Sequence, residues 1–181
     1  MSAGHGHIDP SNKKIALLIA VLALVLAFSE TLGKAAQTNA LSLNIEASNL
    51  WSFFQAKTIR QTVLRTAAEQ TALAAQNDET KKQTEAWRKT AQRYQSEPET
   101  GEGREELMAR AKEAEKKRDR AMAAYHQYEL ASAAVQIAIV LASAAIVTGA
   151  MVLAWIGAGL GVVGVAFCLI GFLAPTAVHL F

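Results

Sequence analysis

Three apolar segments dominate the pattern of hydrophobic and polar positions along the chain. Residues 15–28 form an unbroken apolar run behind Lys13 and Lys14, and residues 130–181 contain no Asp, Glu, Lys or Arg. A helix rising about 1.5 Å per residue needs roughly 20 apolar residues to cross a hydrocarbon core of about 30 Å. The pattern predicts three membrane-spanning helices, at residues 15–33, 133–155 and 160–178.

The second and third predicted spans are separated by Gly157-Ala158-Gly159 as a tight turn, with Trp155 as an anchor at the membrane interface. The first run has a second interpretation. Two lysines, an apolar centre and Ala27-Phe28-Ser29 would also suit a cleaved signal peptide within residues 1–29. We expect a retained anchor, preceded by a flexible tail at residues 1–14.

Residues 34–132 carry most of the charge and have a composition typical of long helices. Neither glycine nor proline occurs from Lys34 to Glu97 or from Arg104 to Thr148. Turn-forming residues at 96–103 predict a loop at the tip between two helices. The predicted fold is all-α, with three transmembrane helices and an extramembrane, coiled-coil-like helical hairpin inserted between the first and the second.

The second arm of this predicted hairpin carries a heptad-type repeat. Its members are Leu107, Ala111, Ala114, Arg118, Ala121, Tyr125 and Tyr128. The same spacing continues through Val135 and Ala142, so we expect one uninterrupted helix from the charged segment into the bilayer. The first arm has a comparable row, which consists of Ala56, Ile59, Val63, Ala67 and Ala74.

The two predicted arms differ in length. At about 1.5 Å per residue, residues 34–95 would extend about 93 Å as one helix, against about 44 Å for residues 104–132. If both arms start at the membrane and meet at the tip, the first arm must be broken. We expect a break at residues 38–44, which have little helical character, and Asn77-Asp78-Glu79 is a second candidate.

A group of aromatic and basic residues in the first arm allows two interpretations. The group consists of Trp51, Phe53, Phe54, Lys57 and Arg60. Aromatic residues followed by basic ones are typical of an amphipathic helix at the membrane surface. A core helix packed on the second arm fits the same residues equally well.

Small residues recur on one face of each predicted span. They are Gly157, Gly161, Gly164 and Gly171 in the third span, Ala138, Ala142 and Gly149 in the second, and Ala16, Ala20, Ala23 and Ala27 in the first. Helices in lipid associate through close backbone approach, because lipid tails are as apolar as the side chains. These faces predict tight packing within a bundle or between the subunits of a homo-oligomer.

Polar residues within the predicted spans raise an alternative, a polar path through the membrane. These residues are Glu30, Gln136, Ser143 and Thr148. Each could instead have a structural role. Glu30 lies four residues before Lys34, a spacing that favours an ion pair, and the others can bond to neighbouring helices.

Reactive side chains do not form a recognisable catalytic pattern. The single cysteine, Cys168, lies in an apolar run, and His5, His7 and Asp9 have no preformed metal geometry in a Gly-rich tail. Gly159 to Gly164 matches a dinucleotide fingerprint but lacks the preceding strand and the following acid. The net charge of +2 is too small for nucleic acid binding. We expect no enzymatic activity, cofactor, metal or nucleic-acid partner.

Two stretches resemble a known family. Residues 49–61 read NLWSFFQAKTIRQ, and the segment from Tyr128 to Ser143 contains YE followed by QIAIVLAS. Both resemble the small bacterial membrane proteins grouped as domain of unknown function four-three-three-seven. The resemblance covers nearly the whole chain and implies a bacterial inner-membrane protein without an established activity, so no catalytic residue is carried over.

These observations favour a structural or interaction role. We expect a multi-pass protein of the bacterial inner membrane that forms a homo-oligomer and docks an unidentified protein partner through its helical insert. A channel or transport component is the alternative.

Two charge signals for the topology oppose each other. Lys13 and Lys14 against Lys34 favour a cytoplasmic N-terminus and so an insert on the other side, whereas the basic residues at 116–118 and 120 favour a cytoplasmic insert. Because long loops count for less in this rule, the two signals nearly cancel, with a slight lean to a cytoplasmic insert.

Overall fold

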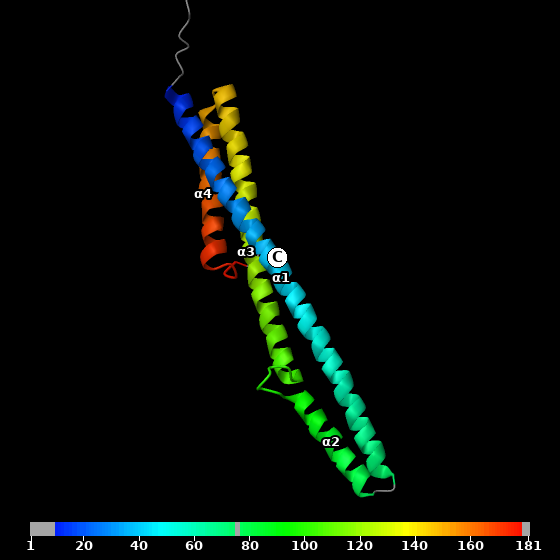
Figure 1. Cartoon of the computed structure of the whole chain (residues 1–181). Helices are drawn as coiled ribbons and strands as arrows, with labels where there is room; N and C mark the ends of the chain where they lie inside the picture. Colours follow the sequence, from blue (N-terminus) through cyan, green and yellow to red (C-terminus); the bar gives the residue numbers. More distant parts are fainter. Residues whose placement is uncertain (1–9, 75–76, 179–181) are drawn as a thin grey trace, which may run out of the picture. The chain divides into compact units, whose positions relative to one another are not determined.

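The computed structural model describes residues 10–74 and 77–178, and within these ranges it contains four helices and no strand. The helices are α1 (Pro10–Leu73), α2 (Asp78–Gln95), α3 (Arg104–Thr148) and α4 (Met151–Leu173), all labelled in Figure 1. Helices α1, α3 and α4 are each long and apolar enough to cross a membrane. The predicted all-α class and the three apolar helices are therefore confirmed for the described residues. His5, His7 and Asp9 lie outside them.

Helix α1 is continuous, so the predicted break at residues 38–44 is wrong. Helix propensity is a weak preference that packing overrides, and no glycine or proline interrupts this stretch. Ala40 and Ala47 on either side of Asn44 are both buried, with 5% and 3% of their surfaces exposed. Thr38 donates its hydroxyl hydrogen to the Lys34 carbonyl within the helix, at 2.9 Å.

The second candidate break, at residue 77, is confirmed. Asn77 caps α2: its side chain accepts a hydrogen bond from the Thr80 N–H at 2.8 Å, and the Thr80 hydroxyl accepts one from the Asn77 N–H at 3.0 Å. The chain reverses here rather than at residues 96–103. Helix α2 then runs back along α1, as the bond from Gln61 to the Ala91 carbonyl shows.

The loop predicted at residues 96–103 is present, but it connects two helices that follow each other along α1. Gln61 of α1 contacts α2 through Ala91 and Gln95, and it also accepts a hydrogen bond from Arg104 at the start of α3. The second arm is therefore α2 followed by α3. This removes the apparent length mismatch, because Asp78–Gln95 belongs to the shorter arm rather than the longer one.

The chain divides into two compact units. The apolar unit contains residues 10–40 and 119–178 of the described chain, and the charged unit contains residues 41–118. In the apolar unit α1 and α3 are antiparallel, because Ile15 packs with Ala142 and Ala145 while Leu22 packs with Val135.

The connection between α3 and α4 corrects a second prediction. The turn lies at Gly149 and Ala150, not at Gly157-Ala158-Gly159, which is inside α4. Gly149 has φ 69°, a left-handed conformation that glycine adopts without steric cost, and its N–H bonds to the Ala145 carbonyl at 3.0 Å. Gly149 thus ends α3 and is exposed, instead of continuing the packed face of Ala138 and Ala142.

The glycine face of α4 is used for packing inside the chain. A methyl group at Gly157 would lie 2.8 Å from the Ala138 carbonyl oxygen of α3, and one at Gly161 would lie 2.5 Å from a methyl carbon of Leu22 in α1. Gly164 and Gly171 are also buried against α3, the latter beside Gln127 and Tyr128. Close backbone contact therefore joins α4 to both of its neighbours.

The charged unit has its own core between α1 and α3. Ala47 and Leu50 pack with Leu107, Ala111 and Ala114, and Trp51 and Phe54 lie against them. The α3 repeat therefore contributes buried residues at the predicted spacing. The predicted α1 row does not, because Ile59 and Val63 are 65% and 61% exposed. The buried residues of α1 instead include Lys57, Gln61 and Ala68.

Gly157→Ala should destabilise the apolar unit by about 1–3 kcal/mol, because its methyl group meets a backbone carbonyl that cannot rotate away. Gly159→Ala is the matched control, since a methyl group there meets nothing within 4 Å. That variant should be neutral or gain about 0.5–1 kcal/mol from lower backbone entropy. Thermal unfolding in mild detergent measures both, and equal stabilities would contradict the packing described.

Candidate functional site

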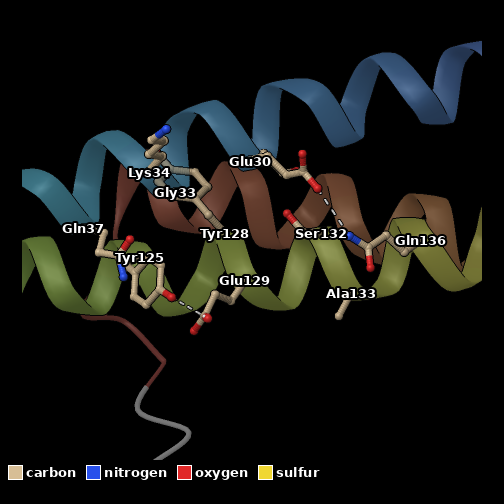
Figure 2. A pocket seen from close by; sticks show the side chains of 11 residues that line it. Glu30, Gly33, Lys34, Gln37, Tyr125, Tyr128, Glu129, Ser132, Ala133 and Gln136 are labelled. Atoms are coloured by element: carbon tan, nitrogen blue, oxygen red, sulfur yellow. Dashed lines mark hydrogen bonds between the residues drawn. The ribbon is translucent and has the colours of Figure 1, made fainter.

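Interacting polar side chains gather in both units of the described chain. In the apolar unit they line a groove between α1 and α3 with a volume of about 460 Å³ (Figure 2). Hereafter it is called the polar groove. Its lining residues are Ser29, Glu30, Gly33, Lys34, Gln37, Tyr125, Tyr128, Glu129, Ser132, Ala133 and Gln136.

Antiparallel packing of α1 and α3 creates the polar groove. Its α1 residues begin directly after the apolar run at 15–28, and its α3 residues lie on both sides of residue 130, where the uncharged segment begins. Gly33 permits close approach of the two helices here, since a methyl group would lie 3.3 Å from Tyr128 Cβ. The groove therefore marks the boundary between polar and apolar sequence on both helices.

Hydrogen bonds hold the two carboxylates of the groove, as Figure 2 shows. Glu30 Oε1 accepts from Gln136 Nε2 at 3.3 Å, and Glu129 Oε1 accepts from the Tyr125 hydroxyl at 2.6 Å. This bond to Glu129 raises the pKa of Tyr125, because the carboxylate favours the protonated phenol. His126 Nδ1 lies 3.3 Å from the other oxygen of Glu129.

Lys34 does not pair with Glu30. Figure 2 shows its side chain extending away from both carboxylates, and within the described residues it forms no ion pair. The ion-pair interpretation of the Glu30 to Lys34 spacing is therefore not realised in this structure, and the ammonium group remains available.

The four residues of the predicted polar path separate into two groups. Glu30 and Gln136 are brought together by their hydrogen bond. Ser143 and Thr148 instead donate to carbonyls of their own helix, those of Ile139 and Ala144, at 2.8 Å each. A continuous polar row is therefore not formed by these four side chains in the single chain.

One polar contact between helices had no clear signal in the sequence. Ser29 is fully buried, its hydroxyl donates to the Val25 carbonyl at 3.0 Å, and its Oγ lies 3.1 Å from Cys168 Sγ of α4. Both residues are small and occupy the face where α1 meets α4. The contact follows from the glycine face of α4, which brings Cys168 close to α1.

In the charged unit, polar residues gather where the loop at 96–103 meets α1. This cluster, the polar junction, consists of Lys57, Gln61, Gln95, Glu97, Glu102 and Arg104. Lys57 and Gln61 are buried, Glu102 is exposed, and the others are half-buried. Lys57 is only 6% exposed, and its Nζ lies 3.8 Å from a carboxylate oxygen of both Glu97 and Glu102. The same ammonium lies 5.0 Å from the ring centre of Tyr94.

Arg104 connects the helices at the polar junction. Its guanidinium donates to the Thr58 hydroxyl at 2.8 Å, to Gln61 Oε1 at 2.6 Å and to Gln95 Oε1 at 3.0 Å. It also lies over the ring of Phe54, at 5.0 Å from the ring centre. Buried polar groups cost little free energy only when each has its hydrogen-bond partners. Sliding one helix along another would break these bonds, so the junction fixes the register of the helices.

The aromatic and basic group of α1 belongs mainly to this core. Trp51 donates its ring N–H to Glu115 of α3 at 2.9 Å, and Phe54 packs in the core beside it. Lys57 is buried, whereas Phe53 is 37% exposed and Arg60 is exposed. The structure therefore agrees with the core-helix interpretation of Trp51, Phe54 and Lys57 rather than with a helix at the membrane surface.

The comparison with protein families gives one result. The family model described as Domain of unknown function (DUF4337) matches residues 11–174. The chain belongs to this family. The match covers the polar groove and the polar junction and confirms the resemblance at residues 49–61. No curated protein and no solved structure gives a significant match. Among the described residues of this DUF4337 chain, no three His, Cys, Asp or Glu side chains are grouped to hold a metal ion.

Lys57→Ala should destabilise the charged unit by about 1–3 kcal/mol, because it removes a buried side chain that lies against Phe53 and Tyr94 and pairs with the loop carboxylates. Lys116→Ala, at an exposed position of α3, is the control and should change stability by less than about 0.5 kcal/mol. Amide hydrogen exchange of α2 reports the effect. Equal protection of α2 in both variants would show that the junction does not hold the helices.

Acid should loosen the loop at 96–103 through Glu106. Hydrogen bonds from the Ser96 hydroxyl, its own N–H and the Glu97 N–H lower the pKa of Glu106 below 4.5. A lowered folded-state pKa means that this stabilisation is fully present above pH 4.5 and is lost as the pH falls through the folded value.

The measurement is exchange of the Glu97 amide against pH, corrected for its intrinsic rate. The parent should lose protection on acidification, whereas Glu106→Gln should start with less protection and show no such step. The same acid step in Glu106→Gln would assign the titration to another group.

Proposed function

We propose that this chain is a multi-pass protein of the bacterial inner membrane that acts as a homo-oligomeric scaffold. In this proposal α1, α3 and α4 anchor the protein. The charged unit is an extramembrane helical hairpin, on the cytoplasmic side, that docks a protein partner. The observation that carries the proposal is an exposed row of small residues on α1: Ala16, Ala20, Ala23 and Ala27.

The exposed alanine row supports self-association because the other small-residue surfaces are already occupied. The glycine face of α4 packs on α3 and α1, and Ala138 and Ala142 of α3 are completely buried. In lipid, contact between helices depends on close packing, and alanine allows such contact where large side chains do not. The α1 row is thus a ready surface for a second copy of the chain.

Large apolar side chains next to the row are consistent with a lipid environment. Leu17, Leu24 and Phe28 of α1 are 67%, 58% and 60% exposed, and Trp155 of α4 is 74% exposed. Such exposure is unfavourable in water and ordinary in a bilayer. Basic residues at 116–118 and Arg120, before the second apolar segment, favour the cytoplasmic side for the charged unit.

The charged unit carries an exposed apolar strip that supports partner docking. Ile59 and Val63 lie one turn apart on α1 and are 65% and 61% exposed, although neighbouring residues are strongly polar. Adjacent exposed apolar residues on an amphipathic helix are typical of helix-in-groove or coiled-coil contacts. The proposed docking surface therefore lies on the side of α1 that faces away from the polar junction residues Lys57 and Gln61.

The scaffold proposal predicts that Ala23→Leu weakens the oligomer, because a branched side chain separates the backbones at the alanine row. Leu24→Ala is the control on the neighbouring face. Oligomer mass by light scattering in mild detergent should fall for Ala23→Leu and stay at the parent value for Leu24→Ala. A parent that is monomeric at all concentrations would overturn the proposal.

A channel or transport component is the second candidate, and the Glu30 to Gln136 hydrogen bond favours it, because it places a carboxylate and an amide together at the edge of the spans. The same preparations decide between the two. Reconstituted vesicles that conduct ions or release solute, with loss of that activity in Glu30→Gln, would favour the channel over the scaffold.

A further inference from the structure

We infer that the polar groove binds the phosphoethanolamine headgroup of a membrane lipid. The inference rests on the membrane location in the proposed function and does not require self-association. It begins with position, since the groove lies where both α1 and α3 change from apolar to polar sequence. In a protein that crosses a bilayer this boundary is the level of the lipid headgroups.

The charges of the groove select among headgroups. Glu30, Glu129 and Lys34 line it, two anionic groups and one cationic group. An anionic headgroup would bring a further negative charge beside two carboxylates, which opposes binding. A headgroup with both an ammonium and a phosphate can satisfy the carboxylates and the lysine together.

The atoms that remain available fit this headgroup. Glu30 uses Oε1 for Gln136, and within the described chain Oε2 has no hydrogen-bond partner. Lys34 lines the groove and has an ammonium without an ion pair. Its side chain extends away from the carboxylates in Figure 2, and rotation about its flexible four-carbon stem would bring the ammonium over the groove. The two residues lie one helical turn apart, with about 5–6 Å between their Cβ atoms. That separation suits a phosphate and an ammonium joined by a two-carbon linker.

A primary ammonium fits better than a quaternary one. It has three N–H donors, and the groove offers oxygen acceptors on Glu30, Glu129 and Ser132. A choline group has no N–H to donate and would leave these acceptors without bonds. The groove volume of about 460 Å³ is adequate for a headgroup, and Val140, one turn from Gln136 toward the apolar segment, is 66% exposed to an acyl chain.

The test is native mass spectrometry of the full chain in mild detergent with phosphatidylethanolamine, phosphatidylcholine or phosphatidylglycerol of identical acyl chains. The parent should retain phosphatidylethanolamine at least several-fold more than the other two. Lys34→Gln and Glu30→Gln should each reduce this retention about tenfold. Lys14→Gln, at an exposed lysine near the other end of the apolar run of α1, should leave it unchanged.

A second readout separates a binding role from a purely structural one. Glu30→Gln removes one negative charge from the groove, so its residual lipid binding should shift toward phosphatidylglycerol, a change that loss of folding would not produce. Equal or tighter binding of phosphatidylglycerol by the parent would overturn the inference. So would unchanged phosphatidylethanolamine retention in both groove variants.

The source of the headgroup is tested with soluble glycerophosphoethanolamine. It should not compete with the lipid at equal concentration, because it lacks acyl chains, and effective competition would overturn the assignment to a lipid. The same spectra give the oligomer mass. Loss of selective lipid retention with an intact oligomer rejects only this inference, whereas a monomer that retains the lipid rejects only the scaffold.

Discussion

Close contact between helices is the constraint on which the apolar unit depends. Between helices in lipid there is no hydrophobic driving force, so association must come from contact at short range. At Gly157 the approach is so close that a methyl group would lie 2.8 Å from the Ala138 carbonyl oxygen. This contact requires glycine on α4, and the same α4 face then brings Cys168 to Ser29 of α1.

The polar groove is a consequence of this packing. Helix α4 packs against α1 and α3, which are antiparallel to each other. Gly33 of α1 allows these two helices to approach closely beside Tyr128 of α3. Their polar ends therefore meet at one level, where Glu30 bonds to Gln136 and Tyr125 bonds to Glu129. The proposed headgroup site and the proposed self-association surface can both lie on α1. The groove begins at Ser29, whereas the alanine row lies before it, within the apolar run.

The charged unit is stabilised differently. Its core consists largely of alanine, which buries little apolar surface. Its apolar contacts around Leu50 and Leu107 are supplemented by the polar junction. There Lys57 of α1 pairs with Glu97 and Glu102 of the loop, and Arg104 of α3 donates hydrogen bonds to α1 and α2. A buried cation is tolerated only when its partners are correctly placed. The loop at 96–103 supplies these partners, and so it fixes where α2 ends and α3 begins relative to α1.

The sequence by itself determined the helical class, the three apolar helices, the loop at 96–103 and the repeat of α3 from Leu107 to Ala142. Each depends on local propensity or on periodicity along one segment, and both are visible without a partner helix. The glycine spacing from Gly157 to Gly171 likewise indicated a packing face. Residues 49–61, together with the stretch from Tyr128 to Ser143, indicated the family.

Only the tertiary structure decided the reversal at Asn77, the turn at Gly149 and the inward face of α1. The exposed row at Ile59 and Val63 is more apolar than the buried row of α1, which contains Lys57 and Gln61. Those two polar residues can be buried because partners far away in sequence stabilise them. Periodicity cannot identify such a row, since a polar residue becomes a core residue only when another helix satisfies its hydrogen bonds. The polar groove is hidden for the same reason, because the residues that meet there lie about a hundred positions apart and are joined by packing alone.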